Sequence, residues 1–172
     1  MPEFRVIPSA IEERLEPGPL DQAVLGLARQ KARAVAPQVP DSLVLGADTL
    51  VVVDGEAFGK PACPAMARTM LARLRGRAHE VLTAVAVVDA RSGLGRDGVS
   101  RSLVLMADYP DSLIEAYVAS GSPFDKAGGY AIQDLDGALA AGVVGSYTNV
   151  IGLPLDLTRR LLVEAAPLGS AG

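Results

Sequence analysis

The chain has 172 residues, of which 49% are hydrophobic and 21% charged, and its formal net charge at pH 7 is -4. This composition is that of a folded globular protein of one domain, and it excludes wholesale disorder and a basic surface for duplex nucleic acid. The one cysteine permits no internal disulfide, and no apolar run has the length of a membrane span. We therefore expect a cytoplasmic protein with no membrane partner.

The first half of the chain alternates apolar runs with glycine and proline, which predicts helices and strands in turn. The pattern predicts a short strand at 4–8, a helix at 20–36, a strand at 42–53, a hairpin return at 56–58, a helix between Pro64 and Gly76, and a strand at 79–88. The dipeptide Asp54-Gly55 is typical of the tight turn that the hairpin needs. The second helix is expected to bury Met66, Met70 and Leu74.

The second half has shorter elements and more glycine. The pattern predicts a loop at 89–98, an edge strand at about 99–105, a helix at 111–120, glycine-rich turns and short strands to about 151, a helix from 154 to about 166, and a frayed tail at 167–172. Together the elements indicate a single α/β domain over residues 1–172, with a substantial and largely antiparallel sheet.

One carboxylate interrupts the most apolar run of the chain. The segment from Leu43 to Leu45 precedes Asp48, and the segment from Leu50 to Val53 follows it, so the run is expected to be a strand packed on both faces. An unpaired carboxylate buried in such a strand would be strongly destabilising or would become neutral. Asp48 is therefore a candidate functional residue.

Two lysines are candidates for binding an anion. Lys31 is seven residues after Val24, so it lies near the middle of the apolar face of the 20–36 helix. It is either a lysine that snorkels past the edge of the core or an ammonium held over an anion. Lys60 stands between a glycine and a proline, where it is either a solvated turn residue or a second ligand of the anion.

Together with Asp48, these lysines suggest a site for phosphate and a divalent metal ion. Carboxylates bind hard cations through oxygen, and lysines neutralise the phosphoryl charge that repels a nucleophile. Glu12 and Glu13 are candidates for a second carboxylate at the metal.

Gln133 is a candidate for recognising a nucleobase. It follows two glycines and an apolar stretch in DKAGGYAIQ, residues 125–133, and is expected to end a strand at the mouth of a pocket. Its amide offers a donor and an acceptor, which complement an imide or amide edge; the alternative is a solvated strand end. His79, the only histidine, is expected to be hydrogen-bonded near the start of its strand, and Cys63 to have no functional role.

Five motifs in order resemble the Maf family of nucleoside triphosphate pyrophosphatases. They are GADTLVV, the GKP after a hairpin, LRGRAHEVLTAVAV, DKAGGYAIQ and GSYTNVIGLPL, and the similarity runs from about residue 4 to residue 162. The resemblance implies a mixed α/β fold, with a curved mixed sheet flanked by helices and two lobes separated by a cleft, related to the inosine triphosphate pyrophosphatases. It also implies hydrolysis of a nucleoside triphosphate to the monophosphate and pyrophosphate with a divalent cation, Mg²⁺ or Mn²⁺.

The resemblance also assigns roles to residues. It implies that Asp48 is the proton acceptor and a metal ligand, that Thr49 is a specificity neighbour, and that Gln133 helps to choose the base. The same family pattern assigns Lys31, Lys60 and Glu12 to the charged part of the pocket, with Glu12 at the metal, and Tyr147 and Asn149 to the shape of the pocket. The form KAGGYAIQ resembles the subgroup that acts on dTTP and UTP. In this reading Asp48 faces the cleft, where a metal ion and a water complete its surroundings.

One family motif has no counterpart in the 172 residues. The family begins with an apolar strand and a Ser-x-Ser-Pro-Arg-Arg loop, whereas this sequence opens at the strand that follows the next helix. We expect either a start of translation assigned too far downstream or a truncated form, with an uncovered sheet edge that favours a homodimer. Two other functions stay open: a catalytically impaired regulator that binds nucleotides, and an interaction protein related to cell division.

Overall fold

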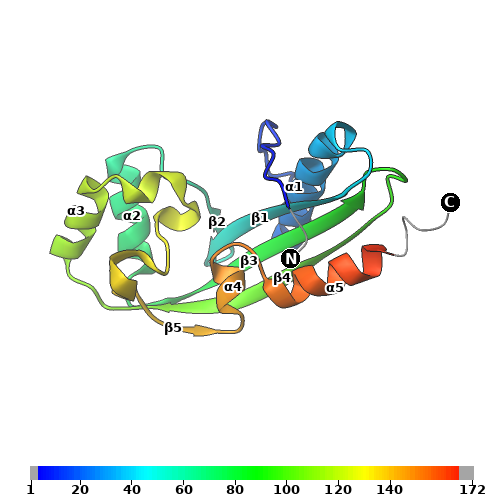
Figure 1. Cartoon of the computed structure of the whole chain (residues 1–172). Helices are drawn as coiled ribbons and strands as arrows, with labels where there is room; N and C mark the ends of the chain where they lie inside the picture. The colour runs from blue at the N-terminus through cyan, green and yellow to red at the C-terminus, as the bar shows by residue number, and fades with distance from the viewer. Residues whose placement is uncertain (1–3, 167–172) are drawn as a thin grey trace. The chain divides into compact units, whose positions relative to one another are not determined.

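The computed structural model describes residues 4–166, which divide into two compact units. Of these residues, unit 1 comprises 4–48, 84–99 and 155–166, and unit 2 comprises 49–83 and 100–154. The strands of one five-stranded sheet are, in spatial order, β2 (Glu56–Phe58), β1 (Leu43–Val53), β3 (Ala78–Asp89), β4 (Gly95–Met106) and β5 (Ala140–Val144) (Figure 1). Strands β1, β3 and β4 supply residues to both units. Helices and sheet together confirm the mixed α/β fold, while the single domain stays a prediction.

In unit 1, helix α1 (Leu20–Val35) approaches strand β1 closely at Gly46. A Cβ added at Gly46 would lie 2.4 Å from the backbone oxygen of Ala28 and 3.1 Å from the Cβ of Ala32. Only glycine therefore allows this approach. The 3-10 turn η1 (Ala36–Gln38) follows the helix, close to the predicted end.

Helix α5 (Leu155–Ala165) covers the other face of the sheet in unit 1. Neighbouring residues of a strand point to opposite faces, so Ala47 points away from the side on which Gly46 meets α1. Ala47 packs instead against a buried cluster from β3 and α5, which consists of Val85, Val87, Leu157, Leu161 and Ala165. The sheet of unit 1 thus lies between two helices.

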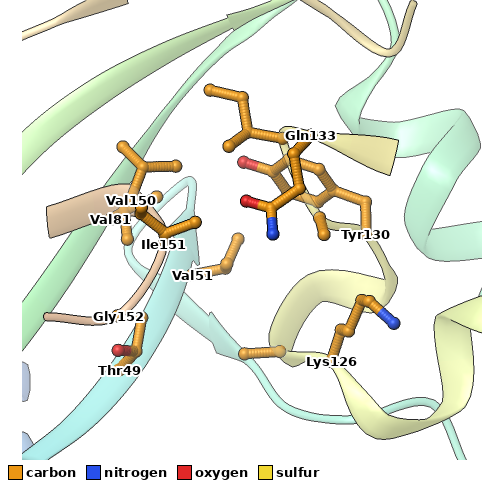
Figure 2. A pocket seen from close by; sticks show the side chains of 12 residues that line it. Thr49, Val51, Val81, Lys126, Tyr130, Gln133, Val150, Ile151 and Gly152 are labelled. Carbon is orange, nitrogen blue, oxygen red and sulfur yellow. The ribbon is translucent and has the colours of Figure 1, made fainter. Parts of the chain in front are cut away.

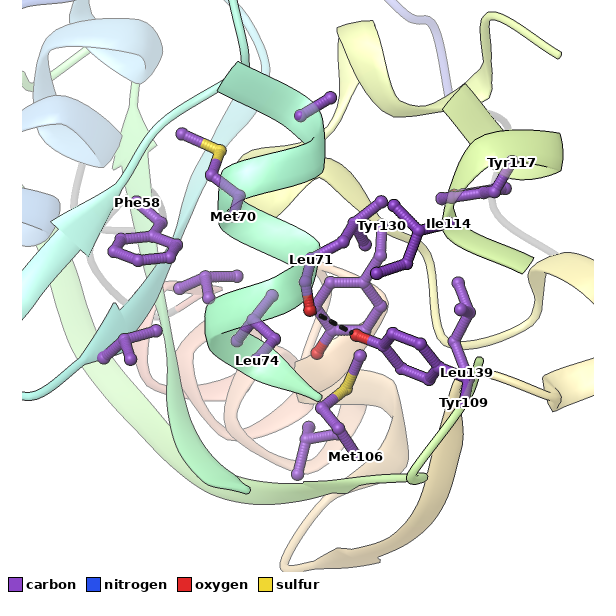
Figure 3. Packing of buried hydrophobic residues seen from close by; sticks show 14 of the residues in the cluster. Phe58, Met70, Leu71, Leu74, Met106, Tyr109, Ile114, Tyr117, Tyr130 and Leu139 are labelled. Carbon is purple, nitrogen blue, oxygen red and sulfur yellow. Dashed lines mark hydrogen bonds between the residues drawn. The ribbon is translucent and has the colours of Figure 1, made fainter. Parts of the chain in front are cut away.

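Unit 2 has its own core, built on helices α2 (Pro64–Leu74) and α3 (Asp111–Ala119), which pack against each other. Figure 3 shows Leu71 and Leu74 of α2 beside Tyr109, whose hydroxyl donates a hydrogen bond of 2.7 Å to the carbonyl oxygen of Leu71. Burial of the aromatic and aliphatic side chains in this cluster is the main stabilising term of the unit.

The predicted hairpin is confirmed at the edge of the sheet. Asp54 and Gly55 have φ angles of 52° and 80°, and Val53 pairs with Glu56 across the turn in an antiparallel register. Positive φ angles at both central residues are typical of the two-residue turn whose twist matches that of the two strands of a hairpin. This turn fixes the start of β2.

Short turns replace strands in the region that holds Gln133. The turns are η2 (Ser122–Asp125), η3 (Ala127–Gly129) and η4 (Asp134–Gly137), with helix α4 (Tyr147–Val150) after β5. Gly128 and Gly129 have positive φ angles of 70° and 74°, and a Cβ added at Gly128 would meet Val51 at 2.9 Å. The prediction that Gln133 ends a strand is therefore wrong, because the glycines turn the chain and Gln133 is the residue directly before η4.

Other strand predictions also need correction. Residues 4–8 form no strand, because no strand of the described chain pairs with them. Strand β1 is not packed on both faces throughout, since Leu43 is 39% exposed and Leu45 is 37% exposed. The strand predicted at 99–105 is not an edge strand, because β4 lies between β3 and β5.

The remaining differences are local. Met66 is exposed, because it lies in the first turn of α2 and only Met70 and Leu74 of the predicted set are buried. The loop predicted at 89–98 is shorter, because β3 continues to Asp89 and β4 begins at Gly95. The frayed tail predicted at 167–172 lies outside the described residues. No helix among residues 4–166 is long and apolar enough to cross a membrane.

Candidate functional site

A cluster of three charged side chains lies in unit 1 at the point where α1 meets β1. The ammonium of Lys31 is 2.5 Å from Oδ1 of Asp48 and 2.8 Å from Oε1 of Glu13. Asp48 lies two residues after Gly46 and therefore on the same face of β1, where Gly46 lets α1 come close. The side chains of Lys31 and Asp48 are 19% and 10% exposed, so this ion pair is largely withdrawn from water.

The pairing fixes the charge of the cluster. Burial by itself would lower the pKa of Lys31, but the hydrogen bonds to Asp48 and Glu13 outweigh burial, and the pKa of the ammonium is raised above its ordinary value. Lys31 is therefore a cation at neutral pH. In the structure this ammonium contacts two carboxylates instead of extending into water as a snorkelling lysine does, and its role in binding an anion stays a prediction.

Two other predicted residues lie apart from this cluster. Glu12 is exposed and forms an ion pair of 2.7 Å with Arg14, so Glu13 rather than Glu12 is the neighbour of Lys31. Lys60 is exposed on the surface of unit 2. Its charge is close enough to Asp125 to add to the lowering of the pKa of that carboxyl, after the larger effect of the hydrogen bond from Lys126.

The two carboxylates of the cluster suit a divalent cation that takes only one or two ligands from the protein. Within residues 4–166 no three His, Cys, Asp or Glu side chains form a group that could hold a metal ion by themselves. Mg²⁺ is often held by one or two carboxylates, with phosphate oxygens and water in the other positions. Asp48 and Glu13, which converge on one ammonium, fit that requirement.

A pocket of about 290 Å³ lies in unit 2 (Figure 2). Its walls come from β1, β3, the 126–133 segment and the 150–152 segment, and most are apolar. The lining residues are Thr49, Val51, Val81, Lys126, Ala127, Tyr130, Ala131, Ile132, Gln133, Val150, Ile151 and Gly152. Thr49 and Gln133, both predicted as substrate-binding residues, thus line the same pocket, and the Gln133 amide points into it in Figure 2.

Thr49 belongs to a chain of hydrogen bonds that leads away from the pocket. Its Oγ1 lies 3.0 Å from Oγ1 of Thr83, and the hydroxyl of Thr83 donates to the backbone oxygen of Asn149 at 2.9 Å. Thr83 and Asn149 are fully buried. The side-chain nitrogen Nδ2 of Asn149 donates to the carbonyl oxygen of Val81 at 3.0 Å and to Oγ of Ser102 at 2.9 Å. This chain ties the 149–152 turn to strand β3.

The prediction that Asn149 and Tyr147 shape the pocket has two outcomes in the structure. Asn149 does not line the pocket, but its hydrogen bond from Thr83 holds the turn whose residues Val150 to Gly152 do line it. Tyr147 is exposed and is not among the lining residues. Cys63 is exposed as well.

Lys126 is a pocket residue that the sequence reasoning did not single out. The side chain contributes to the wall, while its ammonium donates to the carbonyl oxygen of Ser122 and to Oδ1 of Asp125, each at 2.7 Å. In Figure 2 the nitrogen of Lys126 points away from Gln133. The lysine beside the glycines in DKAGGYAIQ was a signal that could have drawn attention to it.

Tyr130 forms another wall and is held by the only histidine. Its hydroxyl lies 2.6 Å from Nε2 of His79, and the two rings meet edge to face at 5.4 Å. Burial lowers the pKa of His79 to about 4 and raises the pKa of Tyr130, so both side chains are neutral at pH 7. The predicted hydrogen bond of His79 at its strand start is confirmed.

Comparison with known proteins identifies the family. The Maf family, described as Maf-like protein, matches residues 1–165. A dTTP/UTP pyrophosphatase of Syntrophus aciditrophicus is 43% identical over 172 residues, which cover 99% of this chain and 83% of that protein. Proteins of the same name from Moorella thermoacetica and Anaeromyxobacter dehalogenans are each 49% identical, over 92% and 94% of this chain and 82% and 83% of their own lengths. The chain belongs to the Maf family.

Proposed function

We propose that this protein hydrolyses dTTP and UTP to the nucleoside monophosphate and pyrophosphate, and so removes these nucleotides from the cellular pool. The proposal is supported by the names of relatives that share 43% to 49% of its residues. The structural observation that carries the proposal is the cluster of Lys31, Asp48 and Glu13, in which Lys31 and Asp48 are largely shielded from water. Such a cluster supplies a base, a cation and a second carboxylate, which are the groups that phosphoanhydride hydrolysis uses.

In the proposed reaction Asp48 accepts a proton from the water that attacks the α-phosphorus. Before substrate binds, Asp48 is engaged by Lys31, which stabilises its ionised form. When the triphosphate arrives, its oxygens compete for the ammonium, so Lys31 turns to the phosphates and leaves Asp48 able to accept a proton. Lys60 is proposed as a second cation for the phosphate chain. The reaction then depends mainly on positioning and on offsetting charge.

A divalent cation, Mg²⁺ or Mn²⁺, is part of this proposal. Asp48 and Glu13 are the residues that would hold it, and Glu12 stays a predicted ligand. When bound, the ion supplies charge stabilisation for the phosphates and for the leaving pyrophosphate. The chain itself binds the substrate, orients it and takes the proton.

The base is proposed to occupy the pocket that Thr49 and Gln133 line. Uracil and thymine present O4 as an acceptor and N3–H as a donor, and the Gln133 amide and the Thr49 hydroxyl together offer a donor and an acceptor to match them. Cytosine reverses this pattern, and a purine is too large for a site bounded by Thr49 and the 127–133 segment. We expect kcat/KM for dTTP and UTP to exceed that for dCTP, GTP and ATP by about tenfold or more.

The proposal also covers the setting of the reaction. The protein is expected to act in the cytoplasm, where nucleotide pools are held, without duplex nucleic acid or membrane partners. A homodimer remains part of the proposal, and β2 and β5 are the strands at the edges of the sheet.

A nucleotide panel tests this function. The purified chain is incubated with dTTP, UTP, dCTP, GTP or ATP and Mg²⁺ or Mn²⁺, and both products are quantified. Release of pyrophosphate and monophosphate from dTTP and UTP is the expected result. Tight binding of dTTP without release would favour a nucleotide-binding regulator, and neither binding nor release would contradict the proposal and favour an interaction protein.

A further inference from the structure

The direction of the hydrogen bonds behind Thr49 follows from the chemistry of the groups. The backbone oxygen of Asn149 can only accept, so the single hydroxyl proton of Thr83 lies on the bond between them, which is 2.9 Å long. Thr83 therefore has no proton left for Thr49, although their oxygens are 3.0 Å apart. Thr49 must donate its own proton to Thr83. The hydroxyl oxygen of Thr49, a residue that lines the pocket, thus has only lone pairs left for another partner.

The buried surroundings hold this direction in place. The side chain of Asn149 donates to Val81 and to Ser102, and the backbone N–H of Gly152 donates to the Asn149 oxygen at 3.0 Å. These bonds keep the carbonyl aimed at Thr83. Thr83 is fully buried, so water does not supply it with another acceptor.

Thr49 is therefore a polar residue of the pocket whose hydroxyl has a fixed hydrogen-bonding direction. The side chains around it, such as Val51, Val81 and Ile151, are apolar. Gln133 is exposed, and no hydrogen bond within residues 4–166 holds its amide. An amide that can flip accepts a donor or donates to an acceptor equally well, so it separates uracil from cytosine poorly.

We infer that Thr83 is a positioning residue for base selection: it makes Thr49 an obligate acceptor, which receives the ring N3–H of uracil or thymine. Cytosine has an acceptor at N3, which would face the lone pairs of Thr49 and leave both groups without a partner. This inference rests on the proposed function and deepens it, because it assigns the choice of pyrimidine to a residue that does not touch the pocket.

Variants at the two threonines test the inference through binding. Dissociation constants of non-hydrolysable α,β-imido analogues of dUTP and dCTP are measured by calorimetry with Mg²⁺. Wild type should bind the uracil analogue about tenfold more tightly than the cytosine analogue. Thr83→Val, which keeps the branched shape, should reduce this ratio to about threefold or less, because the Thr49 hydroxyl is then able to turn and donate. Thr83→Ser, which keeps the hydroxyl, should retain the wild-type ratio.

The ratio separates base selection from a purely structural role, since both analogues share the sugar and the phosphates. A loss of affinity that is equal for the two analogues in Thr83→Val would overturn the inference while leaving the proposed function intact. A double-mutant cycle adds a second criterion: in a Thr49→Val background, the further change Thr83→Val should leave the ratio unaltered. The Asn149 oxygen keeps its bond from Gly152 in these variants, which favours correct folding. If Thr83→Val does not fold, an unchanged ratio in Thr49→Val alone overturns the inference. Failure of wild type to bind either analogue would contradict the proposed function as well.

Discussion

Acidification from about pH 7 to 4 should destabilise this protein, and His79 should make an identifiable contribution. Its ring is buried, and burial lowers its pKa to about 4 from the ordinary value of 6.5. In the unfolded chain the same ring is in water and takes up a proton near pH 6.5. Between these two values the unfolded state binds more protons than the folded state, so the free energy of unfolding falls as the pH falls. Above about pH 6.5 the stability is fully present.

The size of the effect follows from the two pKa values. At 1.36 kcal/mol per pH unit, the interval from 6.5 to about 4 corresponds to a loss of about 3 kcal/mol. This is a large part of the free energy of unfolding of a typical domain. The hydroxyl of Tyr130, which is 2.6 Å from Nε2, does not titrate in this interval because its pKa is raised. His79 is the only histidine of the chain, so no other imidazole contributes.

The assay compares wild type with His79→Gln, which keeps a hydrogen-bonding group but does not titrate. Urea unfolding followed by circular dichroism gives the free energy of unfolding at several pH values between about 7 and 4. Carboxylates titrate in both proteins, so their contribution cancels in the difference. Wild type should lose about 3 kcal/mol more than the variant over this range. Parallel curves for the two proteins would refute the reasoning that His79 is held neutral by burial.

Three further predictions concern the reaction, each measured by pyrophosphate release. Asp48→Asn should reduce hydrolysis of dTTP by about a hundredfold or more while the protein stays folded, because the base is lost and the shape is kept; a variant with half the wild-type rate would contradict the role of Asp48. Lys31→Ala should lower kcat/KM by a factor that corresponds to about 1–3 kcal/mol, because a charge-assisted contact is lost. The control is Arg33→Ala, at an exposed residue of the same helix, which should change kcat/KM little. Equal losses in the two variants would mean that the helix face is wrongly assigned. Gln133→Ala should lower turnover of dTTP and of dCTP by similar factors, because the amide can turn to meet O4 of thymine or N4 of cytosine, and dCTP as the best substrate of the wild type would refute the proposed base choice.

The elements that local chemistry determines could be predicted from the sequence. Helix α1 follows from apolar residues at helical spacing and from the prolines after it, and the hairpin follows from Asp54-Gly55, whose positive φ angles the structure confirms. Burial could not be predicted in the same way. Leu43 and Leu45 belong to an apolar run but are exposed, because the neighbours that would cover a strand face come from distant parts of the sequence.

The candidate site shows the same limit. The proximity of Lys31 and Asp48 could be predicted from the sequence, because one cation on an apolar helix face and one acid in an apolar strand each need a partner. Which of Glu12 and Glu13 contacts Lys31 could not be predicted, since both lie in a segment without regular secondary structure and carry the same charge. Thr83 gave no signal at all, because a threonine in a β-strand is ordinary, and its importance comes from the carbonyl oxygen 66 residues further along the chain.

The central claim is that water attacks the α-phosphorus of the nucleotide with Asp48 as the base. Hydrolysis of dTTP by the wild-type chain in H₂¹⁸O, followed by mass spectrometry of both products, tests it most directly. The account predicts one heavy oxygen in the nucleoside monophosphate and none in the pyrophosphate, with formation of both products suppressed in Asp48→Asn. Label in the pyrophosphate, which would place the attack on the β-phosphorus, would contradict the account.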